Sequence, residues 1–180
     1  MILLYKDCIK KYGSKYKLNK LVSQGQLFKI EKGVYSDKKY VPEYQVISAK
    51  YPKAVFTLNS AFYYQQLTDV IPEKYYLTTD RGASKISDNR VIQIFENSKE
   101  LMFGAEMIKY GESKILMYNK ERLLIELLRN KNKLPYDYYK EILINYRTIV
   151  HDLDIPMIQD MAMVLPKSGM IMDTLQTEVF

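Results

Sequence analysis

Lysines, whose ammonium groups can neutralise phosphates, are concentrated at the start of this chain of 180 residues. Residues 1–40 contain ten lysines and three acidic residues, a net charge of 10 − 3 = +7. Residues 41–180 contain 17 basic and 18 acidic residues, a net charge of −1, and the two parts sum to the total of +6. A compact basic segment can bind a polyanion, because each lysine placed near a phosphate releases condensed counterions. A solvated lysine-rich surface would show the same charge pattern.

Within this segment, eight side chains at and after a Gly-Ser turn have the types and spacing expected of a nucleic-acid contact surface. Lys15, Lys17 and Lys20 are expected to meet phosphates, because ammonium groups pair with them without reading sequence. Tyr16 and Asn19 are candidate readers of base edges. The complete set of DNA-binding candidates is Ser14, Lys15, Tyr16, Lys17, Asn19, Lys20, Lys29 and Lys32.

Two short helices would present most of these side chains. Residues 2–12 place apolar side chains three and four positions apart, which predicts a helix with one apolar stripe. Gly13 would end this helix, and Ser14 can cap a second one that runs to about Gln24. Leu18 and its apolar neighbours in the second helix would face inward, leaving the lysines largely elsewhere.

A β-hairpin is expected directly after the second helix. Residues 27–30 and 34–35 favour strands, and the tripeptide at 31–33, Glu-Lys-Gly, favours a tight turn. The order helix, turn, helix, hairpin is the outline of a winged helix-turn-helix, whose second helix enters the major groove. Lys29 and Lys32 would lie on the wing and contact the flanking backbone or the minor groove.

The remainder of the chain predicts a second, mixed domain. The polar stretch 37–43 contains Pro42 and is a plausible junction, which gives domains of 1–40 and 41–180. The predicted fold class is therefore α+β, with a shortened N-terminal winged helix-turn-helix followed by a mixed α/β domain that ends in helices. We expect strands near 54–58, 74–79, 90–95, 105–110 and 114–118, and helices near 43–50, 59–67, 120–131, 135–149, 155–164 and 168–178.

Residues for common catalytic or metal sites are scarce. His151 is the only histidine and Cys8 the only cysteine, so a zinc site, a Ser-His-Asp triad or a Cys-His pair is not expected. No glycine-rich phosphate loop is present. We therefore expect no catalytic residue, metal or cofactor. A weaker alternative is a metal-dependent nuclease that uses Asp88, Glu112 and Lys114, residue types found in such sites.

The same composition argues for a cytoplasmic protein without a membrane partner. No run of about 18 apolar residues is present, so no spanning helix is predicted. The first residues lack the basic and long apolar regions of a signal peptide. A single cysteine excludes an internal disulfide and suits a reducing compartment.

Methionines and acidic residues gather late in the chain. Residues 150–180 carry five acids and Lys167, a net charge of −4. The favoured interpretation is a core-facing methionine stripe on two helices, and the alternative is an adaptable partner surface with an acidic rim. The methionines are Met157, Met161, Met163, Met170 and Met172.

Three stretches, taken in order, resemble the AbiEi-family antitoxins of type IV toxin–antitoxin and abortive-infection systems. Residues 21–35 match the pattern Leu-Val-x-x-Gly-x-Leu-x-x-Ile-x-x-Gly-x-Tyr of that family's wing. Residues 54–63, with 67–68 and 71–72, are similar to its strand and the helix that follows. Residues 118–129 are similar to its Glu-Arg-Thr-Leu-x-Asp-Leu-Leu-Arg helix, with Leu123 and Glu126 as departures. The resemblance covers roughly residues 5–150.

This resemblance implies a DNA-binding antitoxin that binds its own promoter and represses it. It also implies a functional link to a cognate nucleotidyltransferase-like toxin, which the C-terminal domain would oppose. A palindromic operator would suggest a homodimer. Family members commonly have another helix before the helix-turn-helix, and here residues 41–50 or a second subunit would have to replace it. The alternative function is a protein-interaction module whose degenerate winged helix does not bind DNA.

Overall fold

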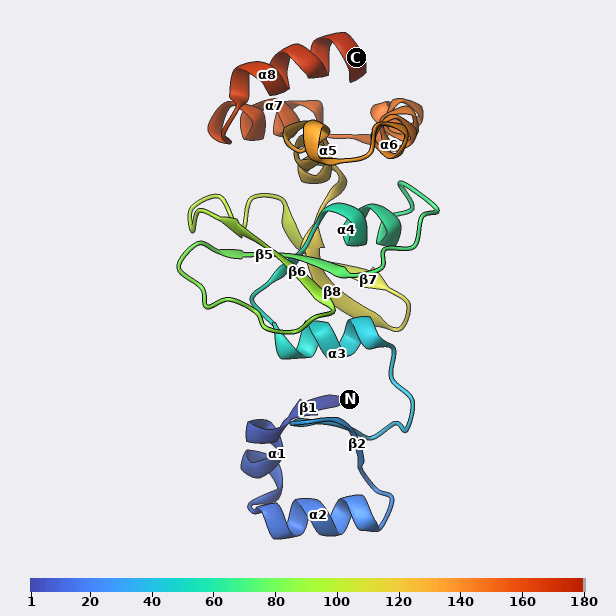
Figure 1. Ribbon diagram of the computed structural model, residues 1–180, viewed down its shortest axis with the longest axis vertical. Coiled ribbons are helices and arrows are strands. Elements are labelled where there is room, and N and C mark those ends of the chain that lie inside the picture. Colours follow the sequence, from blue (N-terminus) through green and yellow to red (C-terminus); the bar gives the residue numbers. More distant parts are fainter. Residues whose placement is uncertain (180) are drawn as a thin grey trace. The chain divides into compact units, whose positions relative to one another are not determined.

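A computed structural model describes residues 1–179 as two compact units. The first spans Met1–Pro52 and the second begins at Lys53. Helices and two separate β-sheets make the protein mixed α+β (Figure 1). The first unit extends beyond residue 40, because helix α3 (Glu43–Lys50) packs against its sheet. No helix among residues 1–179 has the length and apolarity needed to cross a membrane.

The first unit combines a small antiparallel sheet with three helices. Its strands lie in the order β1-β3-β2. Residues 2–4 were predicted as helix but form a strand, because they pair with β3 in the register Ile2↔Ser36 to Leu4↔Val34. The elements are β1 (Ile2–Leu4), α1 (Tyr5–Tyr12), α2 (Lys15–Ser23), β2 (Phe28–Glu31), β3 (Val34–Ser36) and α3.

A small apolar core joins the elements of the first unit. Cys8 of α1, Leu18 of α2, Leu27 and Tyr35 of β3 are buried together. Side chains from Leu3, Ile9, Tyr12, Leu21 and Val22 pack around them. Burial raises the pKa of the Cys8 thiol, and the nearby Asp7 acts in the same direction. The single cysteine is thus a buried, protonated core residue.

The second unit contains a five-stranded mixed sheet in the order β6-β5-β4-β8-β7. The pairs β4–β8 and β5–β6 are parallel, whereas β4–β5 and β7–β8 are antiparallel. The strands are β4 (Val55–Phe56), β5 (Tyr75–Asp80), β6 (Val91–Glu96), β7 (Ala105–Tyr110) and β8 (Ser113–Tyr118).

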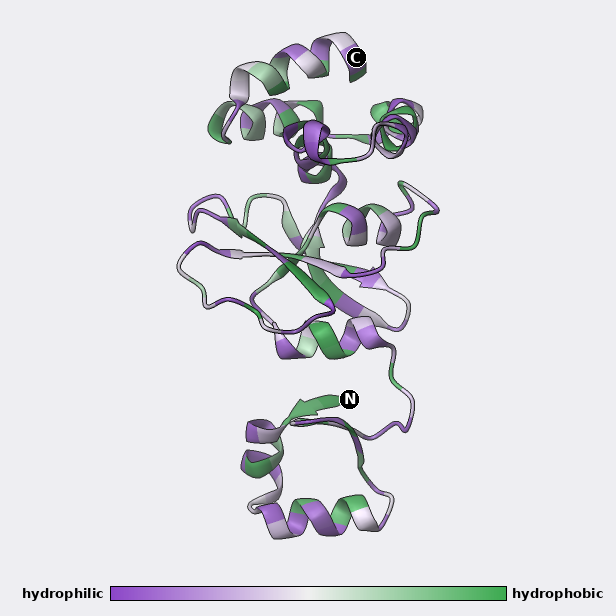
Figure 2. Cartoon of the chain, in the orientation of Figure 1, coloured by the Kyte–Doolittle hydropathy of each residue, from purple (hydrophilic) through white to green (hydrophobic). Residues whose placement is uncertain are grey.

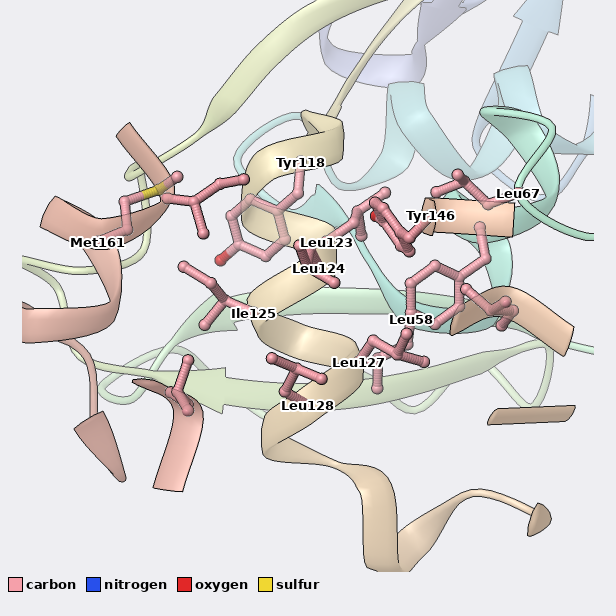
Figure 3. Close-up of a cluster of buried hydrophobic side chains, with 14 of the residues drawn as sticks. Leu58, Leu67, Tyr118, Leu123, Leu124, Ile125, Leu127, Leu128, Tyr146 and Met161 are labelled. Atoms are coloured by element: carbon pink, nitrogen blue, oxygen red, sulfur yellow. The ribbon is translucent and has the colours of Figure 1, made fainter. Parts of the chain in front are cut away.

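Helix α5 (Lys120–Arg129) is the centre of the second unit's core (Figure 3). Its N-cap Asn119 accepts a hydrogen bond from the Arg122 amide at 3.0 Å, which fixes where the helix begins. Five of its apolar side chains are fully buried, because neighbours surround the helix: Leu123, Leu124, Ile125, Leu127 and Leu128. The helices of this unit are α4 (Leu58–Tyr64), α5 (Lys120–Arg129), α6 (Tyr136–Ile149), α7 (Ile155–Val164) and α8 (Ser168–Thr174), and a π-helical turn at Leu175–Val179 follows.

The late methionines do not form the core-facing stripe that was predicted. Only Met161 is buried, while Met157, Met163 and Met170 are exposed and Met172 is partly buried. Branched and small side chains take the inward positions, where their shapes fill the space against α5. The buried residues of this region include Ile158, Ala162, Leu165, Ile171 and Leu175.

Candidate nucleic-acid interface

Helix α2 has one buried side and one exposed side. Successive residues turn by about 100° around a helix, which places Leu18, Leu21 and Val22 together on the core side. Tyr16 and Lys20 lie near the middle of the opposite side, and both are exposed; the Tyr16 side chain is 78% exposed. Figure 2 shows hydrophilic, purple segments along this helix.

The other predicted side chains of α2 lie around that exposed side. Asn19 is exposed and adjoins Tyr16 and Lys20, whereas Lys15 and Lys17 are exposed at its two borders. The exposed side of the helix therefore has a central group of three side chains with one lysine at each border. All five side chains are exposed, and nothing in their burial distinguishes a base reader from a phosphate contact.

Ser14 fixes the start of α2. Its hydroxyl oxygen accepts a hydrogen bond from the Lys17 amide at 3.2 Å, as an N-cap does. Gly13 precedes it with a φ of +89°, a left-handed conformation that glycine adopts without a steric penalty. This Gly-Ser turn sets the direction of α2 relative to α1.

The β2–β3 hairpin carries the two remaining candidates. Lys29 and Lys32 are both exposed, and Lys32 precedes Gly33, whose φ of +80° closes the turn. The register shifts between Lys29 and Glu31, so the hairpin is irregular close to its tip. Glu31 does not add a free negative charge there, because Lys50 of α3 pairs with it at 2.8 Å.

The charge around this surface is one-sided. No acidic residue occurs between Asp7 and Glu31, while that stretch contains six lysines. Over the first unit as the structure defines it, 11 lysines and four acids give a net charge of 11 − 4 = +7. Because α2 itself has no carboxylate, its lysines would not be neutralised by intrahelical pairs.

Sequence reasoning omitted one side chain of the same face. Ser23 lies seven positions after Tyr16 and three after Lys20, so it shares the exposed side, and it is itself exposed. Its hydroxyl donates to the Lys20 carbonyl at 2.8 Å and keeps its acceptor positions available. The spacing of three and four residues along α2 would have predicted that Ser23 lies on this side of the helix.

The residues proposed for a nuclease site do not converge. Asp88 precedes β6, whereas Glu112 and Lys114 lie at the start of β8. Strands β5 and β4 lie between β6 and β8, a separation of about 14 Å at the usual strand spacing. The pairing directions also make β6 and β8 antiparallel, so their starting points lie at opposite ends of the sheet. These three side chains therefore cannot share one metal ion.

Other metal-binding arrangements are not seen in the part of the chain that the structure describes. No group of three or more His, Cys, Asp or Glu side chains is placed to hold an ion among residues 1–179. His151 is exposed and Cys8 is buried in the first unit's core.

No known protein-family model and no curated protein matches the sequence.

Proposed function

We propose that the first unit binds double-stranded DNA as a shortened winged helix-turn-helix. The observation that carries this proposal is the exposed side of α2, which has several lysines, no carboxylate, and a tyrosine and an asparagine between the cations. A helix of this kind can enter the major groove, where lysines meet phosphates and amide or hydroxyl groups meet base edges.

The order of elements supports the same proposal. Helices α1 and α2 follow one another across the Gly-Ser turn, and the β2–β3 hairpin follows α2 directly. A helix-turn-helix needs a third helix to complete its core. Helix α3 packs against β1 and buries Val46 and Ile47, so it is suited to replace the helix that precedes the pair in the resembled family.

In this proposal the side chains have two tasks, pairing with phosphates and reading bases. Lys15 and Lys17 flank α2 and would pair with phosphates on either side of the groove. Tyr16 and Asn19, on the exposed side between these lysines, would approach base edges, and Lys20 beside them would pair with a further phosphate. Lys29 and Lys32, on the hairpin, would contact the neighbouring backbone or minor groove.

We extend the proposal to an antitoxin and autorepressor on the strength of the sequence resemblance. In that role the first unit occupies repeats in its own promoter, as a dimer or a cooperative pair if these are palindromic. The second unit opposes a nucleotidyltransferase-like toxin in the cytoplasm. The arrangement of α2 and the hairpin supports the proposed DNA binding. The three stretches of sequence similar to the resembled family support the proposed antitoxin role.

Fluorescence anisotropy with the native upstream DNA and a scrambled duplex tests the DNA-binding part. Lys17→Ala combined with Lys20→Ala should weaken binding to both duplexes. The double variant should also make the slope of log affinity against log salt concentration shallower by about two, because each phosphate contact contributes about 0.9. The matched control is Lys109→Ala combined with Lys114→Ala, which removes the same charge from exposed positions on β7 and β8. Equal salt slopes for the two double variants would show that α2 does not contact the DNA.

A second candidate function, a protein-interaction module, is favoured by one observation. Met163, Val164 and Met170 are 65%, 58% and 39% exposed at the junction of α7 and α8. Apolar side chains with this exposure, near acids such as Asp160 and Asp173, could contact a partner protein. This module would show little salt-sensitive DNA affinity, so the anisotropy experiment also distinguishes the two functions.

A further inference from the structure

Strand β6 forms one outer edge of the second unit's sheet, and β7 forms the other. Among residues 1–179, no strand pairs with the outer side of β6. Residues 91–95, with the sequence Val-Ile-Gln-Ile-Phe, contain no charge, proline or glycine. Phe95 is 44% exposed, and the four residues before it are partly exposed. An open apolar edge of this kind is a template for pairing with another strand.

The opposite edge of the sheet is protected against such pairing. Strand β7 carries exposed charged side chains at Glu106 and Lys109. Charges on an edge strand hinder the approach of another chain, and native proteins commonly protect their edges in this way. The contrast between the two edges indicates that β6 is the edge used for association.

Alternate backbone groups of β6 point away from the sheet. The Tyr75 amide of β5 donates to the Arg90 carbonyl at 2.8 Å, so the even-numbered residues along β6 bond to β5. Residues 91, 93 and 95 therefore direct their amides and carbonyls outward. Within residues 1–179, no hydrogen bond from a loop reaches the backbone of Gln93 or Phe95.

These outward groups are self-complementary around Gln93. Two copies of β6 that run antiparallel about a two-fold axis place Gln93 opposite Gln93 of the second copy, and each amide meets the other's carbonyl. In this register the Phe95 amide meets the Val91 carbonyl of the second copy. The Val91 amide needs no partner there, because it already donates to the Asp88 carbonyl at 3.0 Å.

The side chains agree with the same register. Ile94 packs against the core on the face that carries α5, and on this face it meets Ile92 of the second copy. On the other face, Val91 meets Phe95 of the second copy. Residues 90 and 96, at the two ends of the paired segment, have opposite charges, so no like charges oppose one another.

We propose that β6 is the interface of a homodimer, in which two five-stranded sheets join edge to edge. The occupant of the edge is a second copy of this chain, because the backbone groups and side chains of β6 complement themselves around Gln93. This association belongs to the second unit and does not rest on the proposed DNA binding. It gives each assembly two first units, the number that a palindromic site needs.

Sedimentation equilibrium of the full chain over a series of concentrations tests the dimer. We expect a reversible rise from the mass of one chain to that of two. Phe95→Lys should weaken dimerisation about tenfold or more, because it places an ammonium group against Val91 of the second copy. The matched control is Met107→Lys, a similar change at a 58% exposed position on β7, which should leave the dimer constant within about twofold.

Disulfide cross-linking tests the register independently. Gln93→Cys faces itself across the axis with Cα atoms about 5.5 Å apart, which is within the range of a disulfide. Phe95→Cys lies about 14 Å from its counterpart, because four residues of offset separate them. Mild oxidation should therefore give a covalent dimer for Gln93→Cys and leave Phe95→Cys as single chains. The wild type is the control for Cys8, which is buried in the first unit's core.

Three results would overturn the proposal. They are a wild type that keeps the mass of one chain at every concentration, equal dimer constants for Phe95→Lys and Met107→Lys, and equal cross-linking of the two cysteine variants. Phe95→Lys should keep a cooperative thermal transition, which separates loss of the dimer from loss of the fold. If this variant unfolds instead, the cross-linking of Gln93→Cys decides. None of these measurements involves DNA, so they are independent of the DNA-binding test.

Discussion

Arg122 is fully buried in α5, and every part of its guanidinium has a partner. Its Nη2 pairs with Glu96 at 3.1 Å and its Nε with Glu126 at 2.9 Å. Its Nη1 donates to the Glu100 carbonyl at 3.1 Å, and its charge lies 4.6 Å from the centre of the Tyr118 ring. Removing one member of such a buried group leaves a charge uncompensated, which costs about 3–5 kcal/mol. The network therefore joins α5 to the end of β6 and the following loop.

Gly104 allows that loop to approach Arg122. A Cβ at this position would lie 2.5 Å from the Arg122 Cβ, and the backbone φ is +71°. We expect Gly104→Ala to lower the free energy of unfolding by about 2–3 kcal/mol, through the clash and the left-handed backbone. Gly169→Ala is the control: it meets no atom within 4 Å and lies in α8, so it should stabilise by about 0.5–1 kcal/mol. Urea denaturation of both variants measures the difference, and similar losses would contradict this account of Gly104.

Glu96 makes the stability of the second unit depend on pH. Burial alone would raise its pKa, but Arg129, the Asn97 backbone amide and Arg122 together outweigh burial and hold the pKa below the ordinary value of 4.5. A carboxylate with a depressed pKa contributes stability above its unfolded-state pKa, and this contribution is lost as the pH falls through the folded-state pKa. The wild type should therefore lose stability below about pH 4.5, and Glu96→Gln should show a shallower loss. Urea denaturation between pH 3 and 7 tests this; equal slopes would exclude Glu96 as a contributor.

At the scale of single elements, the residues at a helix end determine which side chains of the helix face the core and which face solvent. Ser14 begins α2, and this start sets which side chains face the core and which face solvent. Helix α4 ends in a Schellman arrangement, with the Leu67 amide bonded to the Phe62 carbonyl at 2.8 Å. Gln66 takes the left-handed position in this turn with a φ of +60°, where glycine is usual.

Gln66→Gly should therefore stabilise the protein, by about 0.5–1 kcal/mol, because glycine adopts this conformation without the steric cost. Gln24→Gly is a matched change at the end of α2, where φ is −83° and glycine only adds freedom to the unfolded chain. The midpoints of thermal unfolding should rise for the first variant and fall for the second. A fall for both would mean that the Gln66 side chain contributes more than its backbone strain costs.

At the scale of the whole molecule, charge and core size differ between the two units. The first has a net charge of +7 from 11 lysines and four acids, and the second has 16 basic and 17 acidic residues, a net of −1. The second unit holds the larger core, which extends from α4 to the π-helical turn at Leu175–Val179. Polyanion binding and partner binding, if both occur, would therefore belong to different units.

Deleting residues 153–180 tests how far the second core depends on its last helices. This deletion removes buried Ile158, Leu165, Ile171 and Leu175, each of which would cost about 2–5 kcal/mol as an alanine substitution. The total exceeds the usual stability of a domain, about 5–15 kcal/mol, so the truncated second unit should lose its cooperative thermal transition. Met163→Lys, at a 65% exposed position, should keep that transition, and it is the better probe of partner binding. A truncated chain with a normal transition would show that the core does not need α7 and α8.

The sequence by itself determined the features that depend on local chemistry. Ser14 and Asn119 were identifiable as caps, because a side-chain oxygen at a helix start satisfies backbone amides nearby. The hairpin and the helices at 43–50 and 120–131 followed from turn residues and apolar spacing, and they were confirmed within one or two residues at most ends. The excess of lysine near the start needs no structure at all.

Only the tertiary structure decided the features that depend on distant partners. Residues 2–4 form a strand because their backbone pairs with the edge of β3. Ile158 and Ile171 take inward positions of α7 and α8, whereas Met161 is the only late methionine buried there, because the shape of α5 and its neighbours selects what packs. Arg122 meets Glu96 across 26 positions of sequence, and the Thr68 hydroxyl donates to Glu141 of α6 across 73 positions. Local periodicity carries no information about such contacts, since they arise only when separate elements pack together.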